Sequence, residues 1–153
     1  MLNLHEKIAE FARYHQTVGN RVCHYIGIPL ITIAVLGALA SVDYTFIIGV
    51  RTIYFDLAIG LLIITLVYDL TLSPSIAVGI FIAGLTAYVI AKQLSAFVLI
   101  GLFCVGWVMQ ITGHRHFEHN NPAFTDNLLH MFIGPRWLIN ELFKAVKTAA
   151  HNS

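Results

Sequence analysis

The stretch from Leu94 to Phe124 reads LSAFVLIGLFCVGWVMQITGHRHFEHNNPAF. Its first part, residues 94–111, is mostly apolar and long enough for a helix that crosses a lipid bilayer. Its second part, residues 112–124, holds His114, His116 and His119 together with Glu118. The stretch therefore predicts a membrane-spanning helix that leads directly into a group of side chains able to bind a metal.

The composition of the whole chain agrees with a membrane protein. Of its 153 residues, 58% are hydrophobic and 11% are charged, with a mean hydropathy of +0.76. A chain this short has too little interior to bury so much apolar surface, so the excess is expected to face lipid. The net charge of +1 gives no electrostatic basis for binding nucleic acid. Cys23 and Cys104 imply no disulfide framework.

The apolar runs predict an all-α integral membrane bundle that forms one domain over residues 1–153. Four spans are expected, at about residues 23–40, 53–70, 74–91 and 94–111. Pro29 is expected in the first turns of the first span, where a missing N–H costs little. The piece between residues 44 and 50 is too short to span, and is expected in the far interface or as an extension of the first helix.

Amphipathic segments are expected at both ends of this bundle. Residues 3–14 predict a helix that lies on the membrane surface or packs against the rest of the protein. Residues 126–147 predict one or two interfacial helices, broken at Gly134-Pro135, with Trp137 at the membrane surface.

The distribution of basic residues predicts the orientation. Four spans place both termini on one side. Most basic side chains then share that side, namely Lys7, Arg13, Arg21, Arg115, Arg136, Lys144 and Lys147, while Arg51 and Lys92 lie on the other. Basic loops favour the cytoplasm, so both termini are expected there, in a bacterial inner membrane or the endoplasmic reticulum.

A second polar stretch, YHQTVGNRVCHYIGIP at residues 14–29, supplies His15, Asn20 and His24. Four spans bring it to the same membrane face as the histidines of residues 112–124, which predicts a metal site. His15 and His24 are nine residues apart, so a break near Gly19 would be needed to point both at one centre.

On the later stretch, His114 and Glu118 are four residues apart and share a face if the helix continues past Gly113. His116 and His119 cannot both share a helical face with His114, so at least one of them is expected to be solvated or to lie behind the ligands. Gln110 lies one turn before His114 and is expected either to orient a ligand's ring or to bond a neighbouring helix.

The ligand types alone leave the metal open. Imidazole suits iron, zinc, copper and nickel, and a set of histidines and a carboxylate with open positions suits Fe(II) oxygen chemistry. Zinc hydrolases use similar ligands.

At these two stretches the sequence resembles the membrane family of 2-hydroxy fatty acid dioxygenases, the Mpo-like proteins. The first matching pattern is His15, Asn20, His24 and Pro29. The second consists of Gln110, Gly113-His114, Phe117-Glu118, Pro122-Ala123 and Asp126-Asn127-Leu128, with Pro135 and Glu141 also fitting.

The resemblance implies an Fe(II) enzyme of fatty acid α-oxidation, which uses O₂ to cleave a 2-hydroxy fatty acid to an acid one carbon shorter. It implies that His15, His24 and His114 hold the iron, with Glu118 as a further ligand or a base. Asn20 and Gln110 would orient ligands or the substrate carboxylate, and the lipid-like chain would lie between spans. Two alternatives remain open: another metal-dependent membrane lipid enzyme, such as a hydroxylase or zinc hydrolase, and a non-enzymatic carrier of metal or haem.

Overall fold

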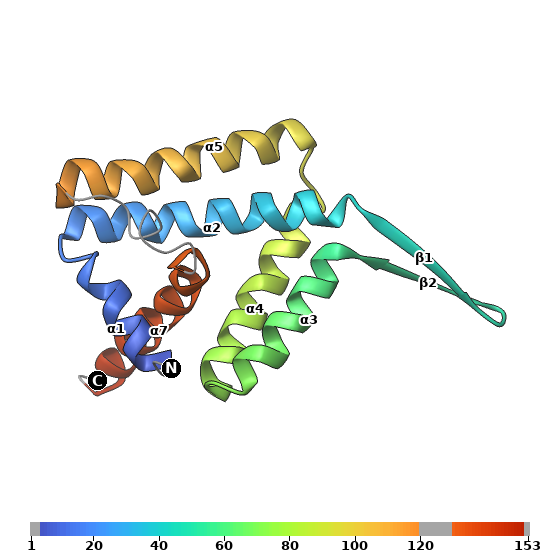
Figure 1. Ribbon diagram of the computed structural model, residues 1–153, viewed down its shortest axis with the longest axis horizontal. Helices are drawn as coiled ribbons and strands as arrows, with labels where there is room; N and C mark the ends of the chain where they lie inside the picture. The colour runs from blue at the N-terminus through green and yellow to red at the C-terminus, as the bar shows by residue number, and fades with distance from the viewer. Residues whose placement is uncertain (1–3, 120–129, 152–153) are drawn as a thin grey trace.

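The computed structural model describes residues 4–119 and 130–151. In chain order its elements are α1 (Leu4–Arg13), α2 (Val18–Ala40), β1 (Asp43–Ile48), β2 (Arg51–Asp56), α3 (Leu57–Leu70), α4 (Pro74–Ala91), α5 (Ala96–Thr112), the π-helix η1 (Gly113–Glu118) and α7 (His130–His151). Figure 1 shows α2 and α5 side by side, while the α3–α4 pair runs steeply away from α2. The predicted helical architecture is confirmed, with a two-stranded hairpin in addition.

The α2–α5 pair is antiparallel and held close by small residues. A Cβ atom on Gly27 would lie 2.9 Å from the carbonyl oxygen of Gly106, and one on Gly106 would lie 3.0 Å from the carbonyl oxygen of Gly27. Such close backbone contact is how helices pack in lipid, where apolar side chains gain little by leaving the bilayer. The other helices are arranged around this pair.

Helix α2 begins earlier than the first predicted span. The side chain of Thr17 caps it by accepting a hydrogen bond from the Asn20 N–H at 3.3 Å, so the polar residues before Cys23 are helical as well. Pro29 therefore lies in the interior of α2 rather than in its first turns, which corrects the sequence-based expectation.

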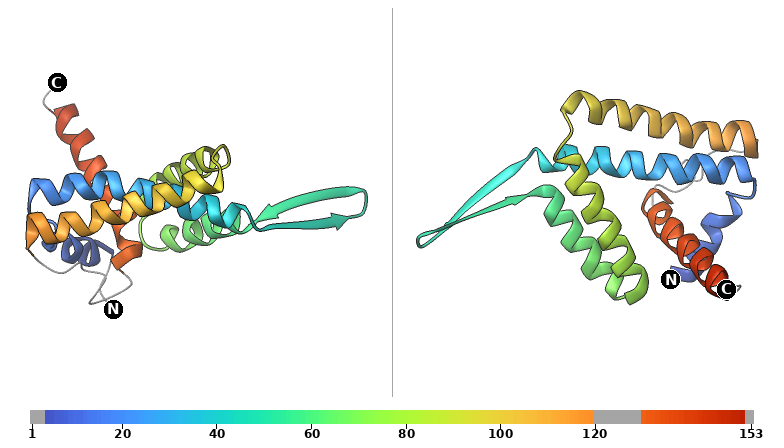
Figure 2. Two further views of the ribbon diagram at one scale, coloured as in Figure 1. Left: turned by 90° about the horizontal axis from the view of Figure 1, so that it is seen from above. Right: turned by 180° about the vertical axis from the view of Figure 1, so that it is seen from behind.

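The segment before α3 forms a β-hairpin, which the sequence analysis did not predict. Strands β1 and β2 pair in antiparallel register from Asp43 with Asp56 to Ile48 with Arg51. Gly49 takes a φ of 62° in the turn, a conformation that glycine adopts easily. Both strands are rich in β-branched and aromatic residues, which favour extended backbone. In both views of Figure 2 the hairpin projects beyond the helices.

The hairpin shortens the second predicted span. Residues 53–56 belong to β2, and α3 starts at Leu57 because the Asp56 carboxylate caps it, accepting from the Ile59 N–H at 2.9 Å. At 14 residues, α3 is shorter than the roughly 17 residues that cross a bilayer. The segments of the described chain that are long and apolar enough to cross are Val18–Ala40, Pro74–Ala91 and Ala96–Glu118. These helices indicate a membrane protein, and α4 has the bounds predicted for the third span.

Helices α1 and α7 pack on α2 and α4 around a small apolar core. It consists of Leu4, Ile8, Phe11, Ile28, Ile76, Ile133 and Trp137. The sequence left two environments open for the N-terminal helix, the membrane surface and packing against the rest of the protein. The structure shows packing. Helix α7 continues through Gly134-Pro135, which contradicts the predicted break. A Cβ on Gly134 would lie 3.2 Å from Ile28 Cδ1, so this glycine permits close packing. Residues 126–129 of the predicted interfacial segment lie outside the described residues.

A buried ion pair joins α3 to α7. The Arg136 Nε donates to Asp69 Oδ1 at 2.7 Å, and the relative exposure of the two side chains is 8% and 0%. The same guanidinium donates to the Phe132 carbonyl and lies over the ring of Tyr68. These contacts anchor α7 to the α3–α4 hairpin and so help to place Trp137, which is next to Arg136.

Candidate metal centre

Three histidines from separate segments meet at one end of the α2–α5 pair. His15 follows α1, His24 lies in α2, and His114 lies in η1; all three are buried. The ring centroid of His15 is 4.1 Å from that of His24 and 4.9 Å from that of His114, and the last two are 4.8 Å apart. One nitrogen from each ring falls within 4.8 Å of the others, which places them as potential ligands of a single ion.

Backbone carbonyls orient two of these rings. The Nδ1 of His15 donates to the carbonyl of Phe11 at 2.7 Å, and the Nδ1 of His24 donates to the carbonyl of Asn20 at 3.0 Å. A proton on Nδ1 leaves the lone pair on Nε2, which is the form in which a neutral imidazole binds a metal. The Nδ1 of His114 is buried and has no hydrogen-bond partner among the described residues.

The turn after α5 separates the roles of His114 and Glu118. The helix continues past Gly113, but as the π-helix η1, and the two side chains have different partners. His114 faces the other two histidines. The Glu118 carboxylate instead accepts hydrogen bonds from the Thr17 N–H at 2.6 Å and the Thr17 hydroxyl at 3.2 Å. Glu118 thus ties η1 to the loop that carries His15, and it is not in the three-residue group.

The interruption between helices that brings His15 and His24 together lies before Gly19. Residues 14–17 connect α1 to α2, while Gly19 is inside α2, where a Cβ would lie 2.3 Å from Phe117 Cδ1. Asn20 is fully buried, and its Nδ2 donates to the carbonyl of Tyr14 at 2.9 Å. Asn20 therefore holds the connection from within α2 while its own carbonyl orients His24.

The other candidate residues from the sequence analysis differ in burial and in whether they lie beside this centre. Gln110 is buried and lines the same pocket as His24 and His114. His116 and His119 are exposed and lie outside the three-histidine group. Residues 122–128 of the matching pattern are outside the described residues.

Two aromatic residues that the sequence analysis did not assign to the site pack against the histidines. Phe11 stacks on His15, with ring centroids 4.2 Å apart and planes 20° apart. Trp137, only 1% exposed, lies 5.2 Å from His15 between ring centroids. Trp137 was expected at the membrane surface, and its helical spacing from Ile133 was the available signal for burial. Both rings contribute to the burial of His15, which is 4% exposed.

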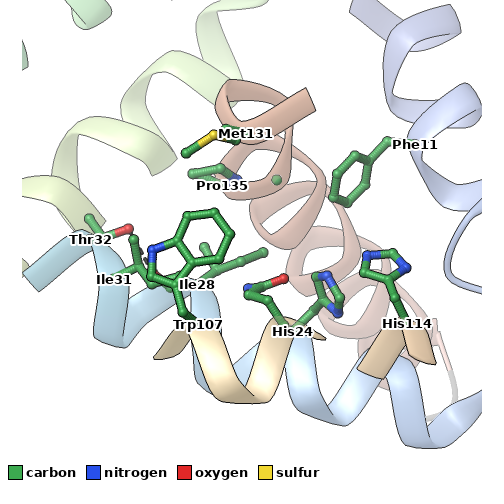
Figure 3. A pocket seen from close by; sticks show the side chains of 11 residues that line it. Phe11, His24, Ile28, Ile31, Thr32, Trp107, His114, Met131 and Pro135 are labelled. Atoms are coloured by element: carbon green, nitrogen blue, oxygen red, sulfur yellow. Dashed lines mark hydrogen bonds between the residues drawn. The ribbon is translucent and has the colours of Figure 1, made fainter. Parts of the chain in front are cut away.

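A pocket of about 90 Å³ opens beside His24 and His114. Figure 3 shows His24 and His114 toward one end of it and Ile31 and Thr32 toward the other. Gln110 on α5 and Thr32 on α2 are its other polar side chains, and the remaining lining is apolar or aromatic. This volume is far below the several hundred Å³ that enclose a drug-sized ligand, so the pocket suits a small polar group joined to an apolar chain.

Comparison with known proteins gives a match over residues 1–146 to the family described as 2-hydroxy-palmitic acid dioxygenase Mpo1-like. The chain belongs to the Mpo1-like family. A curated relative, 2-hydroxy-palmitic acid dioxygenase MPO1 of Saccharomyces cerevisiae, is 43% identical over 47 residues. That match covers 29% of this chain and 27% of the yeast protein. No solved structure matches the chain.

The three histidines of this Mpo1-like chain fit a divalent metal of the first transition row. They offer neutral nitrogen donors, two with the tautomer fixed by a carbonyl and one with a buried unpartnered Nδ1. Buried polar atoms are normally paired, so this nitrogen has a lone pair available for a metal. Three protein donors leave positions open for substrate.

Proposed function

We propose that this chain is a non-haem Fe(II) dioxygenase that cleaves 2-hydroxy fatty acids to acids one carbon shorter. The observation that supports this most strongly is the buried group of His15, His24 and His114 beside a pocket with an otherwise largely apolar lining. Membership of the Mpo1-like family supports the substrate class. Iron(II) held by these imidazoles would supply the site at which O₂ is activated.

The chain's own residues suit a substrate with a polar head and an apolar tail. The carboxylate and hydroxyl of a 2-hydroxy acid would enter the pocket beside His24 and His114. Gln110 lines the same pocket and can donate a hydrogen bond to the carboxylate. Phe11 and Trp137 exclude water from the far side of His15, which strengthens electrostatic interactions at the site.

The proposed reaction balances without an external reductant. One O₂ and one 2-hydroxy acid give the shortened acid, one carbon dioxide and one water. The bond between the carboxyl carbon and the hydroxyl-bearing carbon breaks, and the latter is oxidised to the new carboxyl group. The two electron pairs released reduce O₂.

The test is turnover by protein purified anaerobically and loaded with iron. Supplied with 2-hydroxypalmitic acid and O₂, it should release the acid one carbon shorter and consume one O₂ per product. His114→Ala should abolish product, whereas His116→Ala should retain it, because His116 is exposed outside the group. Absence of the shortened acid with fully loaded, folded protein would contradict the proposal.

A zinc hydrolase is the second candidate, because an all-histidine donor set with open positions also serves zinc enzymes. Metal analysis of the purified protein separates the two. Zinc bound in preference to iron, together with O₂-independent turnover of a lipid ester or amide, would favour the hydrolase.

A further inference from the structure

A second and larger cavity lies on the same helix pair as the candidate metal centre. Its volume is about 690 Å³, and it is formed by the end of α2, the end of α4 and the start of α5. The lining residues are Ala34, Val35, Gly37, Ala38, Leu39, Ala40, Ser41, Ala91, Lys92, Leu94, Ala96, Leu99, Ile100 and Phe103. Among them Ser41 and Lys92 are polar, and both lie at the end remote from the histidines. The rest is a surface suited to hydrocarbon.

The two hollows follow one another along α2 and α5. The pocket at the histidines reaches Thr32 on α2 and Trp107 on α5. The larger cavity begins at Ala34 and Val35 on α2 and at Phe103 on α5. Residues three or four apart are neighbours on a helix. The rings of Phe103 and Trp107 are in contact, with centroids 6.1 Å apart. Figure 3 places Thr32 and Trp107 at the side of the pocket that leads away from His114.

The spacing matches the length of a lipid chain. Eleven residues separate His24 from Val35, which is about 16 Å along a helix that rises about 1.5 Å per residue. An acyl chain in one bilayer leaflet spans about 15 Å, half of the roughly 30 Å hydrocarbon core. A long chain whose head lies at the histidines therefore brings its last carbons to Val35 and Phe103. A much shorter chain ends before them.

We propose that the larger cavity receives the terminal part of the substrate's acyl chain, so that Val35 and Phe103 stand where chain length is recognised. This rests on the proposed function, because it takes the substrate to be a fatty acid with its head at the histidines. The neighbouring positions of the two hollows along α2 and α5 and the apolar lining of the larger one support it. The small side chain of Ala38 lines the cavity, and Leu99 packs over Gly37 at the same wall.

The first test blocks the junction between the hollows. Val35 is 38% exposed and lines the cavity, so Val35→Trp can fill the passage without displacing the core. Val105 is 52% exposed and lines neither hollow, so Val105→Trp is the matched control. The measurement is the ratio of kcat/KM for 2-hydroxypalmitic acid to that for 2-hydroxyoctanoic acid. Val35→Trp should lower the ratio roughly tenfold or more, because the indole overlaps the last carbons of the longer chain and does not reach the shorter one. Val105→Trp should leave it within about twofold of the unsubstituted protein.

The second test does not depend on turnover. A 2-hydroxypalmitic acid analogue with a photoreactive group at its chain end should label the near end of the larger cavity, at Ala34, Val35 and Phe103, and Val35→Trp should abolish that labelling. Labelling spread over the outer faces of α3 and α4, unchanged by Val35→Trp, would overturn the assignment. Failure to convert any 2-hydroxy acid would contradict the proposed function. Normal turnover with an unchanged chain-length ratio would overturn the acyl-chain assignment alone.

Discussion

Glu118 shows how a side chain on the same turn as one of the three histidines can support their arrangement indirectly. Its carboxylate accepts two hydrogen bonds from Thr17, which lies between His15 and α2. Thr17 also caps α2. The carboxylate therefore positions the segment that carries one histidine against the segment that carries another. The family resemblance left Glu118 as either a metal ligand or a base. Residue spacing does not show which groups a carboxylate contacts, so the hydrogen bonds to Thr17 could not be predicted.

This arrangement predicts different outcomes for two substitutions of Glu118. Glu118→Gln keeps an acceptor oxygen for Thr17, so it should retain iron and lower the free energy of unfolding by about 1 kcal/mol. Glu118→Ala removes both hydrogen bonds and should cost about 1–3 kcal/mol. Iron per protein and thermal unfolding in detergent measure the two effects. Loss of iron from a fully folded Glu118→Gln protein would instead make Glu118 a ligand.

At the scale of elements, the sequence predicted the apolar helices better than the connections between them. The span at residues 74–91 was predicted with its observed bounds, because Ser73 and Pro74 mark a helix start. The run before α3 was misread, since short apolar segments rich in isoleucine and aromatic residues suit both a strand and a helix. The close crossing of α2 and α5 depends on which glycines face each other, which only the structure shows.

That crossing predicts opposite effects for similar glycine substitutions. Gly27→Ala and Gly106→Ala each place a Cβ about 3 Å from a carbonyl oxygen and should lower stability by about 1–3 kcal/mol. Gly101→Ala is the control, because a Cβ there meets nothing within 4 Å. Alanine is the better helix former, so this change should be neutral or stabilise by about 0.5–1 kcal/mol. Unfolding in detergent provides the comparison, and equal losses at Gly27 and Gly101 would contradict the packing.

At the scale of the whole molecule, the ion pair between Asp69 and Arg136 joins the α3–α4 pair to α7, and both pack against α2. It is buried, so removing one partner leaves an uncompensated charge. Hydropathy could not predict this contact, because the two residues are 67 positions apart. The predicted cytoplasmic position of both termini stays a prediction.

Breaking this pair should affect stability much more than breaking an exposed one. Asp69→Asn should cost about 3–5 kcal/mol, and the double variant Asp69→Asn/Arg136→Met should recover part of the loss. Lys144→Met removes a pair with Glu141 in which Lys144 is exposed, and should change stability by less than about 1 kcal/mol. Urea unfolding in detergent measures all three. Similar losses for Asp69→Asn and Lys144→Met would show that the ion pair does not anchor α7.

Iron binding by single-histidine variants tests the three-histidine centre most directly. Protein purified without oxygen should bind one Fe(II) per chain. His15→Ala, His24→Ala and His114→Ala should each lower the affinity at least tenfold, because each removes one of three buried donors. His116→Ala, on the same turn as His114 but exposed, should bind iron as the unsubstituted protein does. Full iron binding by a folded His24→Ala or His114→Ala protein would contradict the assignment of the metal centre.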